Sequence, residues 1–119
     1  MRTLTWKERE DLLVTAIEGG SNYWYMLGSE WEPFASKNEP IALSVFKALK
    51  KGENISIFDV ECPDDDKIGI LSLSTLKERE LKMAKEEADH YQNILDDNWD
   101  AETADVWFQY VCLNELVYG

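Results

Sequence analysis

Apolar residues spaced three and four positions apart predict a first helix between residues 5 and 19. Thr5 and Glu8 have the spacing of a capping box, in which each side chain accepts a hydrogen bond from the other residue's backbone. The diglycine Gly19-Gly20 is typical of a helix end, because glycine adopts positive φ without strain. The predicted stripe consists of Trp6, Leu13, Val14 and Ile17, with Glu10 as its polar member.

A second helix is predicted between Pro40 and Gly52. The first helical turn tolerates proline, because the N–H that proline lacks would have no partner there. The apolar face of this helix consists of Ala42, Val45, Phe46 and Leu49.

Three segments are predicted as strands. The aromatic stretch 21–27 is the first, and residues 54–60 alternate between apolar and polar side chains with a period of two. After a turn at 63–66, residues 68–71 are predicted to return beside 54–60. The last two strands therefore form an antiparallel hairpin.

Two further helices are predicted in the last third of the chain. Thr75 and Glu78 have the spacing of a second capping box and predict one long helix, and Asp100 is the predicted N-cap of the final helix. The inner face of the long helix is predicted to be Leu81, Ala84, Ala88, Tyr91 and Leu95.

The order α-β-α-β-β-α-α predicts an α+β fold. Residues 1–119 would form a single domain, in which a small antiparallel sheet of about three strands packs against about four helices.

Charge narrows the classes of partner. The chain has 12 Lys and Arg against 24 Asp and Glu, a net charge of −12, which argues against direct binding of nucleic acid over a broad face. No segment approaches the roughly 18 consecutive apolar residues of a membrane helix. The start of the chain also lacks the apolar run of a signal peptide. We expect a cytoplasmic protein with no membrane contact.

Catalytic and metal chemistry are not indicated by the sequence. Cys62 and Cys112 form no C-x-x-C pair; Cys62 precedes a proline in a predicted loop, and Cys112 lies in an apolar run. His90 is the only histidine, and no serine stands in a G-x-S-x-G motif. We therefore predict no catalytic residue, no metal ligand and no cofactor.

The segment from Glu18 to Tyr25 is the predicted ligand site. Two glycines let the backbone approach a ligand closely, and flat rings beside hydroxyl and amide groups suit a heterocycle. The alternative is that the diglycine only ends the helix and the rings pack in the core. The predicted ligand-binding residues are Glu18, Gly19, Gly20, Ser21, Asn22, Tyr23, Trp24 and Tyr25, with Asp100 and Thr103 from the start of the final helix.

Acidic residues between 96 and 105 only partly match a calcium loop. Asp96, Asn98 and Asp100 occupy the first three ligand positions, but Ala101 stands where the loop needs glycine and Trp107 where it needs glutamate. Acidic side chains near a helix N-terminus are favoured by the helix dipole, which explains the segment better.

The end of the chain is too apolar for an ordinary surface helix. Ten of the thirteen residues from Val106 to Tyr118 are apolar or aromatic. A surface helix shows a single apolar stripe, so we expect part of this one to contact a second copy, although a central core helix would explain the same pattern. The predicted homo-oligomer interface consists of Trp107, Phe108, Tyr110, Val111, Leu116 and Tyr118.

Two segments resemble a family of small proteins from bacteriophage and prophage genomes. These proteins share a segment similar to EGGSNYWY, found here at 18–25, and a closing helix similar to DAETADVWLQ, found here as DAETADVWFQ at 100–109. The ending VYG at 117–119 is similar as well. The resemblance implies a phage accessory protein. Such proteins counter host defence by sequestering a signalling nucleotide or by blocking a defence protein.

Two functions follow as expectations. The leading one is non-enzymatic sequestration of a small nucleotide-like ligand, with cations for its phosphates supplied by Arg2, Arg9, Lys37 or Lys47. The alternative is an acidic inhibitor of a host defence protein, of the anti-CRISPR or anti-restriction type, that imitates nucleic acid. The alternative requires the carboxylates of residues 64–66 to lie beside those of Asp96, Asp97 and Asp100.

Overall fold

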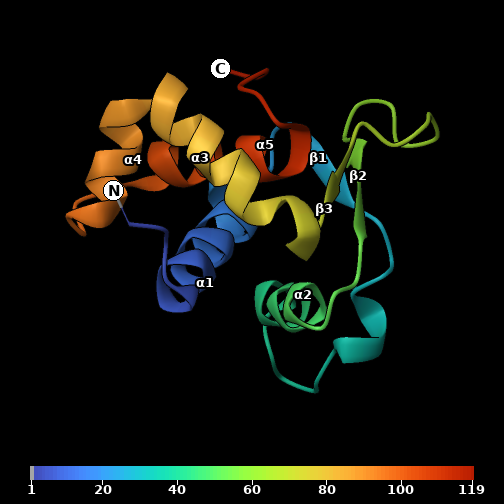
Figure 1. The fold of residues 1–119 in the computed structure, drawn as a ribbon. Coiled ribbons are helices and arrows are strands. Elements are labelled where there is room, and N and C mark those ends of the chain that lie inside the picture. Colours follow the sequence, from blue (N-terminus) through green and yellow to red (C-terminus); the bar gives the residue numbers. More distant parts are fainter. Residues whose placement is uncertain (1) are drawn as a thin grey trace.

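The computed structural model describes residues 2–119, which form a three-stranded antiparallel sheet and five α-helices (Figure 1). The predicted α+β class is therefore confirmed. The helices are α1 (Trp6–Thr15), α2 (Ile41–Lys50), α3 (Leu76–Glu86), α4 (Ala88–Leu95) and α5 (Ala101–Leu113), and the strands are β1 (Tyr25–Leu27), β2 (Ile55–Asp59) and β3 (Gly69–Leu71). A π-helical turn, η1 (Ala16–Gly20), extends α1, and two 3₁₀ turns, η2 (Glu32–Phe34) and η3 (Leu73–Thr75), precede α2 and α3.

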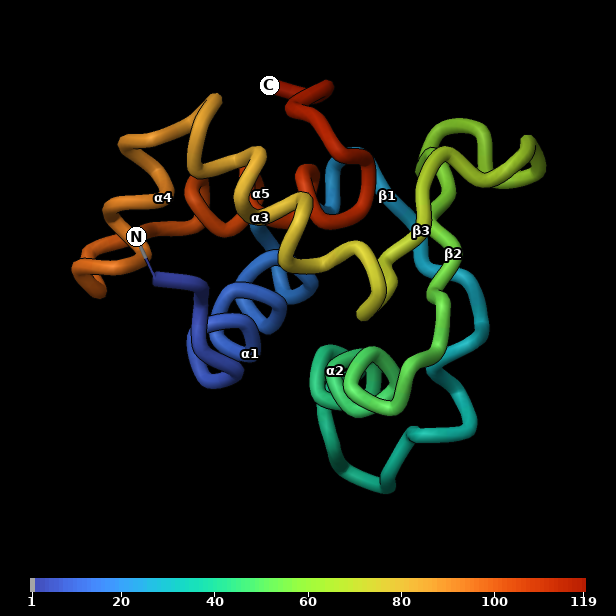
Figure 2. The backbone as a smooth tube through the Cα atoms, viewed as in Figure 1, coloured from blue at the N-terminus to red at the C-terminus, as the bar shows by residue number. Residues whose placement is uncertain are grey.

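Helix α5 is the centre of the molecule. It contacts α1, α3, α4, η1 and β3, and every residue from Thr103 to Cys112 is buried. Figure 2 shows the backbone of α1, α3 and α4 around it, with the sheet at one side. The Asp100 side chain caps its first turn, as predicted, by accepting a hydrogen bond from the Thr103 N–H at 3.1 Å.

The sheet has the order β1-β2-β3, and both pairs are antiparallel. The predicted hairpin is confirmed, with Ile55 and Leu71 paired and buried. Gly69 is required at the start of β3, because a β-carbon there would lie 2.3 Å from the Cys112 carbonyl oxygen. The predicted apolar face of α2 is also confirmed, since Ala42, Val45, Phe46 and Leu49 are all buried.

The predicted long helix between 75 and 95 is two helices. The chain leaves helical geometry at Glu87 (φ −129°, ψ 57°), so α4 begins in a new direction. The second capping box is also wrong: Thr75 makes no capping bond, and the Ser72 hydroxyl accepts from the Ser74 N–H instead. On the predicted inner face, Leu81 is 42 % exposed, because Leu76, Glu80, Met83 and Ala84 are the residues that α3 buries.

The first predicted strand is shorter than expected. Residues 22–24 form a turn, in which the Trp24 N–H donates to the Ser21 carbonyl at 3.2 Å, and only Tyr25–Leu27 pair with β2. The turn directs the side chains of Ser21 and Trp24 toward α5, which a regular strand would not do. Among residues 2–119, no helix is long and apolar enough to cross a membrane.

Candidate functional site

The carboxylate of Asp105, on α5, lies at the centre of the aromatic segment. Its Oδ1 accepts hydrogen bonds from the Ser21 hydroxyl (2.6 Å) and the Trp24 indole N–H (2.9 Å). Its Oδ2 accepts from the Tyr23 hydroxyl (2.5 Å) and from the Gln109 Nε2 (3.1 Å). Asp105 is only 8 % exposed, so these four donors replace the water that a buried carboxylate loses.

Packing covers two of the three rings that the sequence predicted for ligand stacking, whereas Tyr23 is 51 % exposed. Trp24 is 1 % exposed, and Tyr118 from the C-terminal segment stacks on it at 5.2 Å with an angle of 12° between the rings. Tyr25 is buried and meets the Phe108 ring edge-on at 4.9 Å. The prediction that Trp24 stacks on a bound ligand is wrong, because the chain's own Tyr118 occupies its face.

Of the two glycines, Gly20 packs against protein and Gly19 is exposed to open space. A β-carbon on Gly20 would lie 3.2 Å from the Ala101 carbonyl oxygen, so the glycine lets η1 approach the start of α5. A β-carbon on Gly19 would meet nothing, and Glu18 and Asn22 are exposed. The structure therefore brings the predicted segment beside the Asp100–Thr103 turn, where Gly20 packs against Ala101.

Asp100 and Thr103 lie beside a polar cavity of about 410 Å³ that the aromatic segment does not line. Thr103 is 1 % exposed, and its hydroxyl lies 2.7 Å from His90 Nδ1. Capping and burial thus account for both residues. No cluster of three metal-ligating side chains is present in the part of the chain that the structure describes.

The predicted oligomer interface on α5 needs correction. Trp107, Phe108 and Val111 are 0 % exposed and Tyr110 is 2 % exposed within the single chain, so they have no surface left for a second copy. Their burial has a simple cause: helices or strands surround α5 on all sides, which the alternative of a central core helix anticipated. Of the predicted interface residues, Leu116 is exposed and Tyr118 is half-buried.

The acidic segments lie apart. The loop that contains residues 64–66 projects beyond β2 and β3, whereas the turn containing Asp96, Asp97 and Asp100 follows α4 at the opposite end of the molecule (Figure 1). The juxtaposition of carboxylates required for nucleic-acid mimicry is therefore wrong. The two cysteines lie where the sequence placed them, with Cys62 exposed and Cys112 buried, and both are free.

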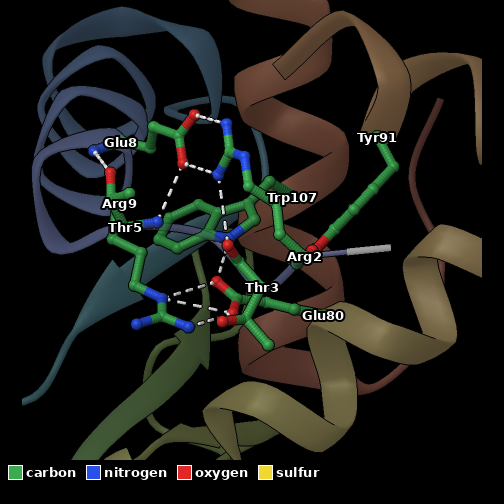
Figure 3. A network of polar contacts seen from close by, with 8 residues as sticks. All are labelled: Arg2, Thr3, Thr5, Glu8, Arg9, Glu80, Tyr91 and Trp107. Carbon is green, nitrogen blue, oxygen red and sulfur yellow. Dashed lines mark hydrogen bonds and ion pairs between the residues drawn. The ribbon is translucent and has the colours of Figure 1, made fainter. Parts of the chain in front are cut away.

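A second polar network joins α1 to α3 and α5 through a buried ion pair (Figure 3). Arg9 donates from Nε and Nη2 to the Glu80 carboxylate, the shortest contact being 2.7 Å. The Trp107 indole N–H donates to Glu80 Oε2 at 2.8 Å. The Arg9 and Glu80 side chains are only 4 % and 2 % exposed. The remaining Arg9 nitrogen, Nη1, points away from Glu80 and has no hydrogen-bond partner within residues 2–119.

Outside this ion pair, the N-terminal segment is held by Arg2. Its guanidinium donates two hydrogen bonds of 2.7 Å to the Glu8 carboxylate, and the Tyr91 hydroxyl donates to its carbonyl at 3.1 Å. Glu8 also completes the predicted capping box with Thr5. The Arg2 guanidinium, with the Thr5 backbone N–H, lowers the pKa of Glu8 to about 2. These contacts fix one wall of a cavity.

We call that cavity, of about 490 Å³, the Trp6 cavity. Its lining combines an indole, two cationic side chains and three hydroxyls, and none of the described residues that line it carries a carboxylate. The Trp6 ring is 36 % exposed, with the Arg9 guanidinium 4.8 Å and the Lys50 ammonium 5.4 Å from its centre. The lining residues are Thr3, Leu4, Thr5, Trp6, Arg9, Leu73, Ser74, Leu76 and Lys77.

Arg9 is the one residue of the Trp6 cavity that the sequence indicated for ligand binding, as a candidate cation. Trp6 was assigned to the core face of the first helix, and Lys77 was given no role. A signal was present, because Trp6 and Arg9 lie three residues apart on one helix. Leu73 and Ser74 of η3 and Lys77 of α3 reach the cavity from a distant part of the chain, which no local pattern predicts.

The environment of the tyrosines predicts an unusual alkaline titration. All five tyrosines have pKa values above the ordinary value, chiefly because burial disfavours the phenolate; that of Tyr23 rises to about 12, with the Asp105 hydrogen bond adding to the effect. Because these values are raised in the folded state, their contribution to stability is present below about pH 10 and is lost as the pH rises through the folded values. Tyrosinate absorbance should therefore appear together with unfolding.

The control for this titration is the same protein in denaturant, where all five tyrosines should ionise near the ordinary value. A tyrosine that ionises near pH 10 while circular dichroism stays native would contradict the prediction.

No family model, curated protein or solved structure matches this chain. The resemblance to phage and prophage proteins therefore stays a prediction.

Proposed function

We propose that this protein binds and sequesters a small nucleotide-like ligand in the Trp6 cavity without turning it over. The observation that carries the proposal is the free Nη1 of Arg9, a side chain 4 % exposed, beside an exposed lysine and an indole in a chain of net charge −12. The volume of about 490 Å³ lies within the range typical of small-molecule sites.

The lining matches the two ends of such a ligand. An anionic group, phosphate or carboxylate, would accept charge-assisted hydrogen bonds from Arg9 Nη1 and from the Lys77 ammonium. A planar ring would lie against Trp6 and Leu73, which together offer exposed apolar surface. Glu80 holds the Arg9 guanidinium in place before the ligand arrives, which reduces the ordering cost of binding.

Sequestration fits this site better than it fits the segment 18–25. That segment donates from Ser21, Tyr23 and Trp24 to Asp105 and buries two of its three rings, whereas the Trp6 cavity keeps hydrogen-bond donors and a partly exposed indole. The resemblance to phage accessory proteins supports the same role. We propose that the protein removes a signalling nucleotide of host defence, with the ligand released unchanged.

Calorimetric titration with adenosine monophosphate, ADP-ribose and a cyclic dinucleotide tests the proposal. We expect at least one of them to bind, and Lys77→Gln to weaken that binding by about tenfold or more, the value of one charge-assisted hydrogen bond. Trp6→Leu should weaken binding further by removing ring contact. Chromatography of the ligand after incubation should recover it intact.

The matched control is Lys85→Gln, which removes a lysine from the same helix at an exposed position outside the Trp6 cavity. It should leave the affinity unchanged. Absence of heat with all three ligands, or equal losses for the two lysine variants, would overturn the proposal. A product peak after incubation would contradict sequestration without turnover.

A further inference from the structure

The outer edge of β1 carries backbone groups that no described residue uses. β1 pairs only with β2. The Gly28 N–H donates to the Ser56 carbonyl (2.8 Å) and the Val60 N–H donates to the Trp24 carbonyl (3.1 Å), so Trp24 and Gly28 direct these backbone groups toward β2. Successive residues of an antiparallel strand face the partner strand and then away from it. The N–H and C=O groups of Tyr25 and Leu27 therefore face away from β2, and none has a hydrogen-bond partner within residues 2–119.

A shallow groove of about 360 Å³ lies against this strand. We call it the β1 groove; its apolar lining comes from Ile17, Tyr25, Met26, Leu27, Trp31 and Ile41. Met26 and Ile41 line the same groove and are 43 % and 50 % exposed. Unused backbone groups next to exposed apolar side chains are what an added strand would cover.

Charge selects the kind of partner. Glu32 lines the β1 groove, and no lysine or arginine is among the described residues that line it. A second copy of this chain would bring another net charge of −12 and a second Glu32 to the same edge, so self-association is disfavoured. A basic partner gains attraction from the same charges.

We infer that the β1 groove docks an extended segment of a partner protein in which apolar residues alternate with lysine or arginine. The segment adds a strand to the sheet through the backbone groups of Tyr25 and Leu27. Its apolar side chains cover Met26 and Ile41, and a basic side chain meets Glu32. The β1 groove shares no lining residue with the Trp6 cavity, so this interaction does not depend on the proposed ligand.

A synthetic peptide, acetyl-Lys-Val-Lys-Ile-Lys-Val-amide, is the probe. We expect chemical-shift changes at the amides of residues 25–28 and slower hydrogen exchange at Tyr25 and Leu27 when the peptide is added. N-methylation of the peptide bonds that face β1 should weaken binding by about tenfold or more, because each removes a backbone donor. Exchanging every peptide lysine for glutamate should weaken it to a similar degree.

Two variants separate this surface from general effects. Ile41→Asp stands at the first residue of α2, where the helix dipole favours a carboxylate, so the fold should survive while peptide binding weakens by about tenfold. Leu81→Asp, at a residue 42 % exposed on α3, is the control and should bind as the wild type does.

Three outcomes would overturn the inference. They are absence of any change at Tyr25 and Leu27 with millimolar peptide, N-methylation without effect, and protection of these two amides that grows with protein concentration alone. The last outcome would assign the edge to a second copy of this chain.

Discussion

Replacing Glu80 with glutamine is expected to lower the free energy of unfolding by about 3–5 kcal/mol, the cost of breaking a buried ion pair. The substitution leaves the Arg9 charge in an interior where it is 4 % exposed, with no carboxylate to balance it. Glutamine also offers one acceptor oxygen where Glu80 uses two, which accept from Arg9 and from the Trp107 indole. Urea unfolding followed by circular dichroism measures the change.

Glu78→Gln is the matched control for this substitution. Glu78 lies two residues away on α3 and is exposed in the first turn, so the free energy of unfolding should fall only by the few tenths of a kcal/mol of a helix-dipole interaction. A double variant, Arg9→Met with Glu80→Met, should regain part of the loss, because it removes both charges together but leaves the buried Trp107 indole N–H without an acceptor. Equal stability of Glu80→Gln and Glu78→Gln would show that the ion pair is not an essential buried contact.

The Arg9–Glu80 pair also explains why the sequence predicted α1 but missed part of what α1 and α3 bury. Arg9 and Glu80 stand 71 residues apart, and each is a charged residue that an apolar-stripe analysis assigns to solvent. Each is buried only because the other is present. Helix α2 has no such pair, and there the pattern of Ala42, Val45 and Phe46 predicted burial correctly.

The sheet shows the same division between local and distant causes. The alternation of Ile55 and Ile57 is a local property, and it predicted β2 and the inward side chains correctly. The segment 21–24 has strand-like residues, yet it forms a turn because Ser21 and Trp24 bond to Asp105, more than 80 residues later. A contact between residues so far apart in the sequence leaves no periodic signal in the chain.

The candidate sites were the least predictable part. The sequence named Arg9 as a cation and named the aromatic segment as the ligand site, but which rings stay open depends on how the C-terminal segment packs. Tyr118 covers Trp24, while nothing in the described chain covers Trp6 to the same extent. Exposed and covered tryptophans look alike in a sequence, because their difference is set by residues far along the chain.

The Gln109 side chain links the C-terminal segment to Asp105. Its Oε1 accepts hydrogen bonds from the backbone N–H groups of Val117 (2.9 Å) and Tyr118 (2.8 Å), and its Nε2 donates to the Tyr118 carbonyl (2.9 Å). The same Nε2 donates to Asp105, which orients the amide. The position of Tyr118 over Trp24 therefore depends on a carboxylate one helical turn before Gln109.

Asp105→Ala is accordingly expected to destabilise the fold by about 2–4 kcal/mol and to loosen the C-terminal segment. The main cause is the Trp24 indole N–H, which is left without an acceptor, together with the loss of several charge-assisted hydrogen bonds. Urea unfolding measures the first effect, and faster amide hydrogen exchange at Val117 and Tyr118 measures the second.

Glu102→Ala is the control for this prediction, because it removes an exposed carboxylate from the first turn of the same helix. It should cost only the few tenths of a kcal/mol of a helix-dipole interaction and leave exchange at Val117 and Tyr118 unchanged. If Asp105→Ala unfolds like Glu102→Ala, the four hydrogen bonds to Asp105 do not hold the aromatic segment. If exchange at Val117 and Tyr118 is unchanged while stability falls, Gln109 holds the C-terminal segment without help from Asp105.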